Sequence, residues 1–344
     1  MKRPRPGPAA ARPAGPGKWP AADLARLLKK YAARASRDVR VGPAVGEDAA
    51  VVRLGGADLV VTTDPVTFAT DAIGWYAVTV NANDVAACGA RPRFFVAAAL
   101  LPVDAGPRDA EAIFAGIAAA CERLGVLLVG GHTERTAGLA RPIVCGTMIG
   151  DLEGRPPISS GGARPGDAAI LTKGAAIEAT ALVARERPDL LAGLPAAVRR
   201  RARNFLFDPG INVVDDARLS REGGARALHD VTEGGVLTGL WEMAAASGLG
   251  LAVDADAIPV RPETRAVCEA AGIDPLAAIG SGALVAAAPP KRAGGIVAAL
   301  ADAGVDAAIV GRFGPRGGRR TILRNGRTTP LVPPAVDAVA RLFD

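Results

Sequence analysis

Apolar positions along the chain follow two spacings, one typical of helices and one typical of strands. Between residues 24 and 31 they recur at i, i+3, i+4 and i+7, which predicts a helix with one apolar face. Further helices are predicted over 73–88, 108–124, 175–185, 233–247, 261–271 and 291–303. Strands are predicted over 49–54, 58–63, 94–101, 126–129, 143–149, 168–172, 225–228, 251–253, 283–288, 307–313 and 320–323. Because strands and helices mix in both halves, the fold class is α/β or α+β.

A stretch rich in Gly, Pro and Ser at residues 150–166 divides the predicted elements into two groups. Since this composition interrupts regular structure, we place the domain boundary there. With 344 residues, 49% of them hydrophobic, the chain can bury two cores. The pattern predicts an N-terminal domain over 19–155 and a C-terminal domain over 163–344, preceded by a disordered basic tail over 1–18.

The formal net charge of +6 arises mostly in that tail, because its basic residues all precede the first acid, Asp23. The rest of the chain is nearly neutral. Aromatic residues make up only 4% of the chain, which leaves little material for base stacking and disfavours a nucleic-acid partner. No apolar run reaches membrane-spanning length. The cysteines, without any C-x-x-C pair, indicate buried free thiols and a reducing cytoplasm: Cys88, Cys121, Cys145 and Cys268.

Acidic segments recur beside the predicted strands and helices, at residues 46–50, 62–64, 81–84 and 229–235. Strands 49–54 and 58–63 form a hairpin around a Gly-Gly turn, so Asp48 and Asp64 should lie at the same end of the sheet. Carboxylates gathered there repel one another unless a cation intervenes. Oxygen ligands of this kind suit Mg²⁺ held against a polyphosphate.

Polar residues interrupt the apolar helix over 73–88 at Asn81, Asn83 and Asp84. Asn81 and Asp84 are three residues apart and share one helical face. Asn and Asp are poor residues inside a helix unless an interaction stabilises them. One interpretation is a polar stripe on the surface, and the other is an edge that faces a ligand.

The segment 130–134 leaves a predicted buried strand through Gly130 and Gly131. Glycines let backbone N–H groups approach an anion closely. The alternative is a tight turn capped by Thr133. His132, one of only two histidines, adjoins the acid Glu134, and a single histidine is usually structural.

The segment 229–235 ends a predicted strand and begins a helix, whose N-terminal N–H groups favour phosphate oxygens. The structural alternative has Asp230 or Thr232 as an N-cap. Lys173, after strand 168–172, offers a cation to the same phosphates or is simply exposed. Neither G-x-x-x-x-G-K-[ST] nor G-x-G-x-x-G occurs after a strand, so a nucleotide here depends on metal and scattered backbone donors.

Taken in order, these motifs resemble the aminoimidazole ribonucleotide (AIR) synthase superfamily, from about residue 20 to the C-terminus. The resemblance implies a mixed, barrel-forming N-terminal sheet with helices and a C-terminal α/β sandwich. It implies a homodimer that pairs through the N-terminal sheets, with ATP and Mg²⁺ in a cleft near that interface. Hydrogenase-maturation HypE proteins, selenophosphate synthetases and thiamine-monophosphate kinases are members.

The resemblance also implies roles for individual residues. The expected Mg²⁺ ligands are Asp48, Asp64, Asp84 and Asp230. The expected nucleotide-binding residues are Asp48, Asp64, Asn83, Asp84, Gly130, Gly131, Thr133, Lys173, Thr232, Gly234 and Gly235. The expected catalytic residues are His132, Glu134 and Asp230. His132 stands where many relatives carry Asp, and Glu134 compensates. His132 or His229 is expected to handle a proton.

The D-x-T-x-G-G pattern that begins at Asp230 is most similar to HypE proteins. HypE proteins normally end in a cysteine, whereas residues 341–344 contain none, so we expect a HypE-like enzyme that acts on a free small-molecule acceptor. The expected reaction is ATP-dependent phosphorylation of an amide-like or acyl oxygen, followed by dehydration or ring closure. The alternatives are a small-molecule kinase of the thiamine-monophosphate type, or a nucleotide-binding accessory protein with a maturation partner.

Overall fold

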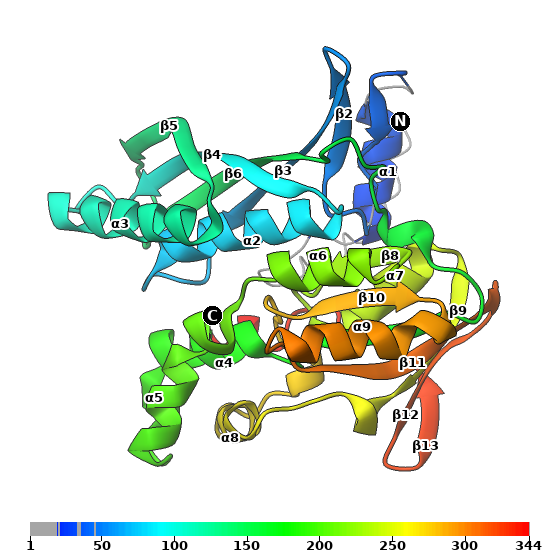
Figure 1. The fold of residues 1–344 in the computed structure, drawn as a ribbon. Coiled ribbons are helices and arrows are strands. Elements are labelled where there is room, and N and C mark those ends of the chain that lie inside the picture. The colour runs from blue at the N-terminus through cyan, green and yellow to red at the C-terminus, as the bar shows by residue number, and fades with distance from the viewer. Residues whose placement is uncertain (1–18, 20, 33–35, 45, 344) are drawn as a thin grey trace, which may run out of the picture.

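The computed structural model describes residues 19, 21–32, 36–44 and 46–343. The basic tail predicted over 1–18 lies outside them. Two mixed sheets, each with its own helices, build the fold, the first one lying above the second in Figure 1. Among the described helices, none combines the length and the apolar character that a membrane span requires. The cysteines are free, and all but the half-buried Cys145 are buried.

The N-terminal sheet has six strands in the order β1-β2-β3-β6-β4-β5. All neighbours are antiparallel except β4 and β5, which are parallel. The elements are α1 (Ala21–Tyr31), β1 (Val39–Val41), β2 (Ala50–Leu54), β3 (Ala57–Val66), α2 (Ile73–Ala87), β4 (Arg91–Leu101), α3 (Pro107–Leu124), β5 (Leu127–Arg135) and β6 (Ile143–Asp151).

Helix α2 lies between the N-terminal sheet and the second domain, as Figure 1 shows. It packs on β3, β6 and β4 on one side, and on α6 (Val214–Glu222) and β8 (Ala227–Asp230) on the other. Both sides of the helix are therefore buried, which explains why its sequence shows no polar stripe. The alternative of an exposed stripe for Asn81 and Asp84 is wrong, because both side chains are buried.

The C-terminal sheet has seven strands in the order β13-β12-β9-β11-β7-β10-β8, all antiparallel except β12 with β9. Besides β8, its strands are β7 (Ala168–Thr172), β9 (Leu249–Asp254), β10 (Leu284–Ala288), β11 (Ala307–Arg316), β12 (Arg320–Arg324) and β13 (Arg327–Pro330). Its other helices are α4 (Ile177–Glu186), α5 (Ala196–Asn204), α7 (Gly235–Ala246), α8 (Pro262–Ala271) and α9 (Pro290–Asp302).

Strand β7 explains why this domain is a sandwich. Its residues are all buried, and successive side chains point to opposite faces. Ala169 and Leu171 enter one core together with α7, while Ala168 and Ile170 enter another together with α6 and α9. Helices thus cover both faces, and the predicted two-domain α/β architecture is confirmed.

Two sequence predictions about strands are wrong. Strand β5 is neither short nor buried, because it runs through Gly130 and Gly131 to Arg135 and is exposed along its length. Gly131 pairs with Ala97 of β4, and a Cβ at Gly131 would stand 2.0 Å from the carbonyl oxygen of Ala97. Gly131 therefore allows the close approach of β5 to β4, whereas a Cβ at Gly130 would meet no atom within 4 Å. Likewise β3 continues through Pro65, because β2 has already ended there and β3 has β6 as its only neighbour.

Asn83 joins the two domains through buried hydrogen bonds. Its Nδ2 donates to the carbonyl oxygen of Ile211 at 2.8 Å, and its Oδ1 accepts from the backbone N–H of Val213 at 2.9 Å. Asn83→Ala should lower the free energy of unfolding by about 3 kcal/mol, because two buried backbone groups lose their partners. Thermal unfolding measures this. Asn204→Ala, at an exposed position, is the control, and an equal melting temperature for both variants would contradict the prediction.

Candidate active site

A cleft of about 600 Å³ lies where the two domains meet. The N-terminal domain contributes the loop before β2, the end of β3 and helix α2. The C-terminal domain contributes α4, the end of β8, α7 and the turn before β10. The acidic lining residues are Glu47, Asp48, Asp64, Asp84, Glu178, Asp230, Glu233 and Glu242. Among the described residues that line the cleft, there is no Lys or Arg.

Asp48 and His229 form an ion pair between the domains. His229 Nδ1 lies 2.5 Å from Asp48 Oδ1, and its Nε2 lies 3.0 Å from Glu242 Oε2. Burial by itself lowers the pKa of His229, but the two carboxylates, Asp48 first, outweigh it and raise the pKa well above 6.5. The imidazole is therefore charged and held between two acids.

Asp84 of α2 and Asp230 of β8 are both buried. Thr62 Oγ1 donates to Asp84 Oδ2 at 2.7 Å. The pKa of Asp84 is raised well above 3.8, first by burial and then by the charges of Asp230, Asp64 and Asp48. These aspartates, far apart in the sequence, thus lie close enough to repel one another.

Asn81 holds Asp64 in place beside this group. Its Oδ1 accepts from the backbone N–H of Asp64 at 2.9 Å, and its Nδ2 donates to the carbonyl oxygen of Asp64 at 3.2 Å. Asn81 and Asp84, which share a face of α2, therefore both face β3 as their spacing predicts. The antiparallel pairing of β2 with β3 brings Asp48 and Asp64 to the same sheet end, as expected.

The residues present fit a hard divalent cation. Ligand atoms of Asp48, His229 and Asp230 all lie within 4.8 Å of one another. Because His229 is engaged by Asp48 and Glu242, the donors left for a cation are carboxylate oxygens, which Mg²⁺ prefers. The repulsion that raises the pKa of Asp84 is what a bound cation would remove.

Glu47 lies at the rim of the same group. Ser159 Oγ donates to Glu47 Oε1 at 2.6 Å, while Oε2 is buried and has no hydrogen-bond partner among the described residues. Burial raises the pKa of Glu47, against the lowering effect of Ser159. The connection between the domains therefore contacts the acidic loop directly.

The alternative of an N-cap at Asp230 or Thr232 is wrong. Helix α7 begins at Gly235, and its N-cap, Gly234, has no capping side chain. The backbone N–H of Gly234 donates to Asp337 Oδ2 at 2.6 Å, and that of Gly235 to the carbonyl oxygen of Thr232 at 3.1 Å. Thr232 itself lines the cleft.

Residues 130–134 are not part of the cleft lining. They lie on the edge strand β5, where His132 Nε2 is 3.0 Å from Glu134 Oε2 and Thr136 donates to Glu134 Oε1 at 2.8 Å. The hydrogen bond from His132, followed by that from Thr136, lowers the pKa of Glu134. The described chain thus leaves these predicted residues exposed and apart from the four aspartates.

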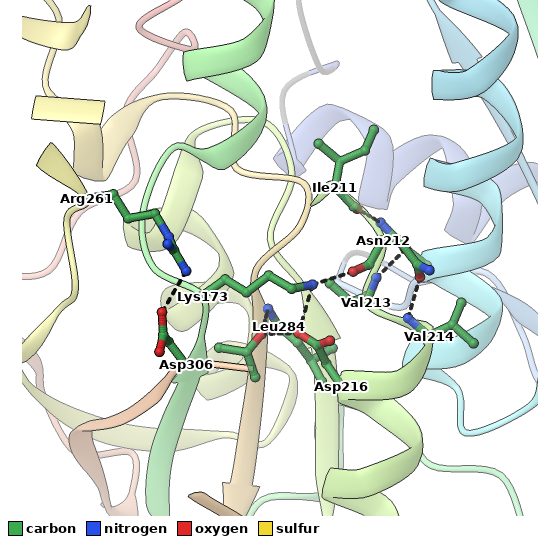
Figure 2. Close-up of polar contacts among 11 residues, drawn as sticks. Lys173, Ile211, Asn212, Val213, Val214, Asp216, Arg261, Leu284 and Asp306 are labelled. Atoms are coloured by element: carbon green, nitrogen blue, oxygen red, sulfur yellow. Dashed lines mark hydrogen bonds and ion pairs between the residues drawn. The ribbon is translucent and has the colours of Figure 1, made fainter. Parts of the chain in front are cut away.

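Lys173 lies in another pocket, of about 510 Å³, at the end of β7. Figure 2 shows its amino group against Asp216 and the Asn212 carbonyl, with Arg261 paired to Asp306 nearby. The Lys173–Asp216 distance is 3.1 Å. Lys173 is therefore buried and not exposed, and neither Lys173 nor Asn83 lines the cleft.

The sequence predictions omitted Glu178, which lines the cleft from the first turn of α4. It is buried, and Ser281 hydrogen-bonds to it through side chain and backbone. Burial, only partly offset by Ser281, raises the pKa of Glu178 to about 7. The available signal was an acid inside the run Ala175–Val183, which apart from Thr180 is otherwise apolar.

Comparison with known proteins places the chain. The N-terminal domain model of the AIR synthase related proteins matches residues 46–152, and the C-terminal domain model matches 164–324. The chain belongs to the AIR synthase related family. It is 32% identical over 284 residues to carbamoyl dehydratase HypE of Rhizobium leguminosarum bv. viciae, covering 77% of this chain and 76% of that protein.

Other family members agree in sequence and fold. Carbamoyl dehydratase HypE of Escherichia coli is 28% identical over 316 residues, covering 87% of this chain and 91% of that protein. The HypE–HypF complex structure matches with a TM-score of 0.69 at 25% identity, covering 84% of this chain and 94% of that one. HypE in complex with ATP matches with a TM-score of 0.67 at 25% identity, covering 83% and 88%.

Proposed function

We propose that this family member is an Mg·ATP-dependent enzyme that phosphorylates an amide-like or acyl oxygen of a small acceptor, with dehydration or ring closure as the outcome. The observation that carries the proposal is the convergence of Asp48, Asp64, Asp84 and Asp230 on one interdomain cleft. The relatives named carbamoyl dehydratase and the HypE structure with ATP support it.

For an acceptor with a carbamoyl group, the proposed reaction has two steps. The amide oxygen bonds to the γ-phosphorus as the bond to the ADP oxygen breaks, and the nitrogen loses a proton. The C–O bond then breaks, phosphate leaves with the electron pair, and the nitrogen loses its second proton to give a nitrile. Mg²⁺ held by Asp48, Asp64, Asp84 and Asp230 would neutralise charge on the phosphates. Because such transfer depends on placement and electrostatics, the protein's task is to hold these groups in position.

Product analysis tests the proposal. The purified protein is screened with Mg·ATP and candidate metabolites, and the reaction mixture is followed by ³¹P NMR. A dehydratase or cyclase releases inorganic phosphate in step with acceptor consumption. A kinase of the thiamine-monophosphate type leaves the phosphate on its acceptor, and its detection would replace our proposal.

A second candidate is a nucleotide-binding accessory protein in a maturation complex. The solved HypE–HypF complex favours it, because that relative assembles with another protein. Tight ATP binding without metabolite-stimulated cleavage, together with a stable complex with a maturation protein, would support this candidate. A cytoplasmic location remains a prediction for either function.

We also propose a homodimer that pairs through the N-terminal sheets. Helices α2 and α3 cover one face of that sheet, while apolar residues of β4 on the other face, such as Phe94, remain partly exposed. The edge strand β5 adds exposed Leu127, Leu128 and Val129. Pairing would cover this apolar surface and bring the exposed residues 130–134 to the interface.

Val129→Lys should convert the dimer to a monomer, because a charge would be buried in the apolar interface. Val129 is 55% exposed in the single chain, so the fold of the monomer should tolerate the change. Light scattering after size-exclusion chromatography measures the mass. Val332→Lys, at an exposed position in the C-terminal domain, should leave the mass unchanged. A dimer that survives Val129→Lys places the interface elsewhere.

A further inference from the structure

The interdomain cleft has two chemically different ends. At one end, Asp48, Asp64 and Asp230 lie close enough to Asp84 for their charges to raise its pKa. At the other, the charges that act most strongly on Glu178 are those of Asp337 and Glu233, not those of the four aspartates. The metal and phosphate groups would occupy the first end, which leaves the Glu178 end for another molecule.

Glu178 has the features of a group that waits for a ligand. The residue is 6% exposed, yet it lines the cleft. Ser281 hydrogen-bonds to the carboxylate, while Oε2 is buried and has no hydrogen-bond partner among the described residues. A buried acceptor atom left unpaired is costly, so its presence in a cleft indicates a donor supplied from outside the chain.

The lining also restricts the charge of that ligand. Glu178, Glu233 and Asp337 gather at this end, and Asp337 is buried behind the turn before α7. The part of the lining that the structure describes offers neither Lys nor Arg. At this end of the cleft, an acceptor that carries a carboxylate or a phosphate would meet the carboxyl groups of Glu178, Glu233 and Asp337, whereas an uncharged N–H donor would be well placed.

We propose that Glu178 and Ser281 form the acceptor subsite, that the acceptor is a small uncharged molecule with a primary amide, and that Glu178 Oε2 takes the amide proton. This inference rests on the proposed function and specifies its substrate class. As the amide oxygen bonds to the γ-phosphorus, the N–H bond breaks and its proton passes to Oε2. Glu178 later releases the proton to solvent.

The pKa of Glu178, raised to about 7 by burial, suits proton transfer near neutral pH. The groups that act on it are Ser281 from the turn before β10, Asp337 from the C-terminal segment and Glu233 from the turn before α7. Tyr76 of α2 also lies close enough for Glu178 to raise its pKa, after the larger effect of burial. Because the carboxylate must be ionised to accept a proton, amide-dependent turnover should rise as pH rises through about 7.

Glu178→Gln keeps the size of the side chain but cannot take the proton. With acetamide, propionamide and methyl carbamate as probes, amide-stimulated phosphate release should fall at least about 100-fold. The Kd for Mg·AMPPNP, measured by calorimetry, should stay within about twofold of the wild-type value, because the metal end of the cleft is untouched. Acetate, propionate and methyl phosphate should not stimulate the wild-type protein. Glu222→Gln, on the exposed face of α6, is the matched control.

Ser281→Ala tests whether Glu178 acts as the proton acceptor, because a purely structural role of Ser281 would not change the pH profile of turnover. The Ser281 hydroxyl lowers the pKa of Glu178, so its loss should shift the rising limb of the pH profile to higher pH. Three results would overturn the inference: full amide stimulation in Glu178→Gln, no stimulation of the wild type by any amide, or equal stimulation by the acids. If instead Asp84→Asn cleaves Mg·ATP as fast as the wild type, the proposed Mg·ATP-dependent function is wrong. That result differs from the three results above, which concern the acceptor subsite alone.

Discussion

Asp84→Asn is expected to lower Mg·ATP turnover about 10³-fold, equivalent to roughly 4 kcal/mol of lost transition-state stabilisation. Asp84 is buried among Asp230, Asp64 and Asp48, and these neighbours together with burial raise its pKa. An amide supplies one neutral oxygen where the cation needs a charged one. Because the Asn oxygen can still accept from Thr62, the fold should be preserved. Steady-state phosphate release measures the effect.

The metal-free melting temperature distinguishes a metal ligand from a structural acid. Removing one of several mutually repelling carboxylates should leave metal-free Asp84→Asn at least as stable as the wild type. Added Mg²⁺ should raise the melting temperature of the wild type by mass action and have little effect on the variant. Asp302→Asn, at an exposed position near the end of α9, is the control. Turnover of Asp84→Asn within about threefold of wild type would refute the metal assignment.

His229→Gln is expected to lower the free energy of unfolding by about 3–5 kcal/mol, because two largely buried carboxylates lose the cation that they share. The imidazole lies between Asp48 of one domain and Glu242 of the other, and its side chain is 4% exposed. His229 therefore contributes to holding the domains together, in addition to any role in proton transfer. Urea unfolding at pH 6 measures the loss.

The sign of the pH dependence follows from the same pair. The pKa of His229 is raised in the folded protein, so its stabilising effect is complete below about pH 6.5, the unfolded value. That contribution is lost as pH rises through the folded value. The difference in free energy of unfolding between the wild type and His229→Gln should therefore become smaller at alkaline pH. Lys291→Gln, at an exposed position in the first turn of α9, is the control and should lower the free energy of unfolding by no more than about 0.5 kcal/mol. Equal losses in the two variants would contradict the prediction.

The local sequence pattern was sufficient to predict where the acids of the N-terminal domain lie relative to one another. A tight hairpin around Gly55-Gly56 necessarily brings Asp48 and Asp64 to one sheet end, and helical spacing places Asn81 and Asp84 on one face. Most of the helices and strands around them were also predicted, because the spacing of apolar residues indicates which face of a helix or strand is buried. Helices α5 and α6 were missed, because their sequences are rich in charged residues and contain few large apolar ones.

Which of these residues meet was decided by the tertiary structure. His229 pairs with Asp48, and Glu178 enters the cleft, only because the second domain packs against α2. Conversely, Gly130 to Glu134 lie on an edge strand, where one chain leaves them exposed. Sequence alone determined the type of most elements and the family of the chain, since both depend on local spacing and ordered motifs. The composition of the cleft depends on contacts between residues more than a hundred positions apart, and these only domain packing creates.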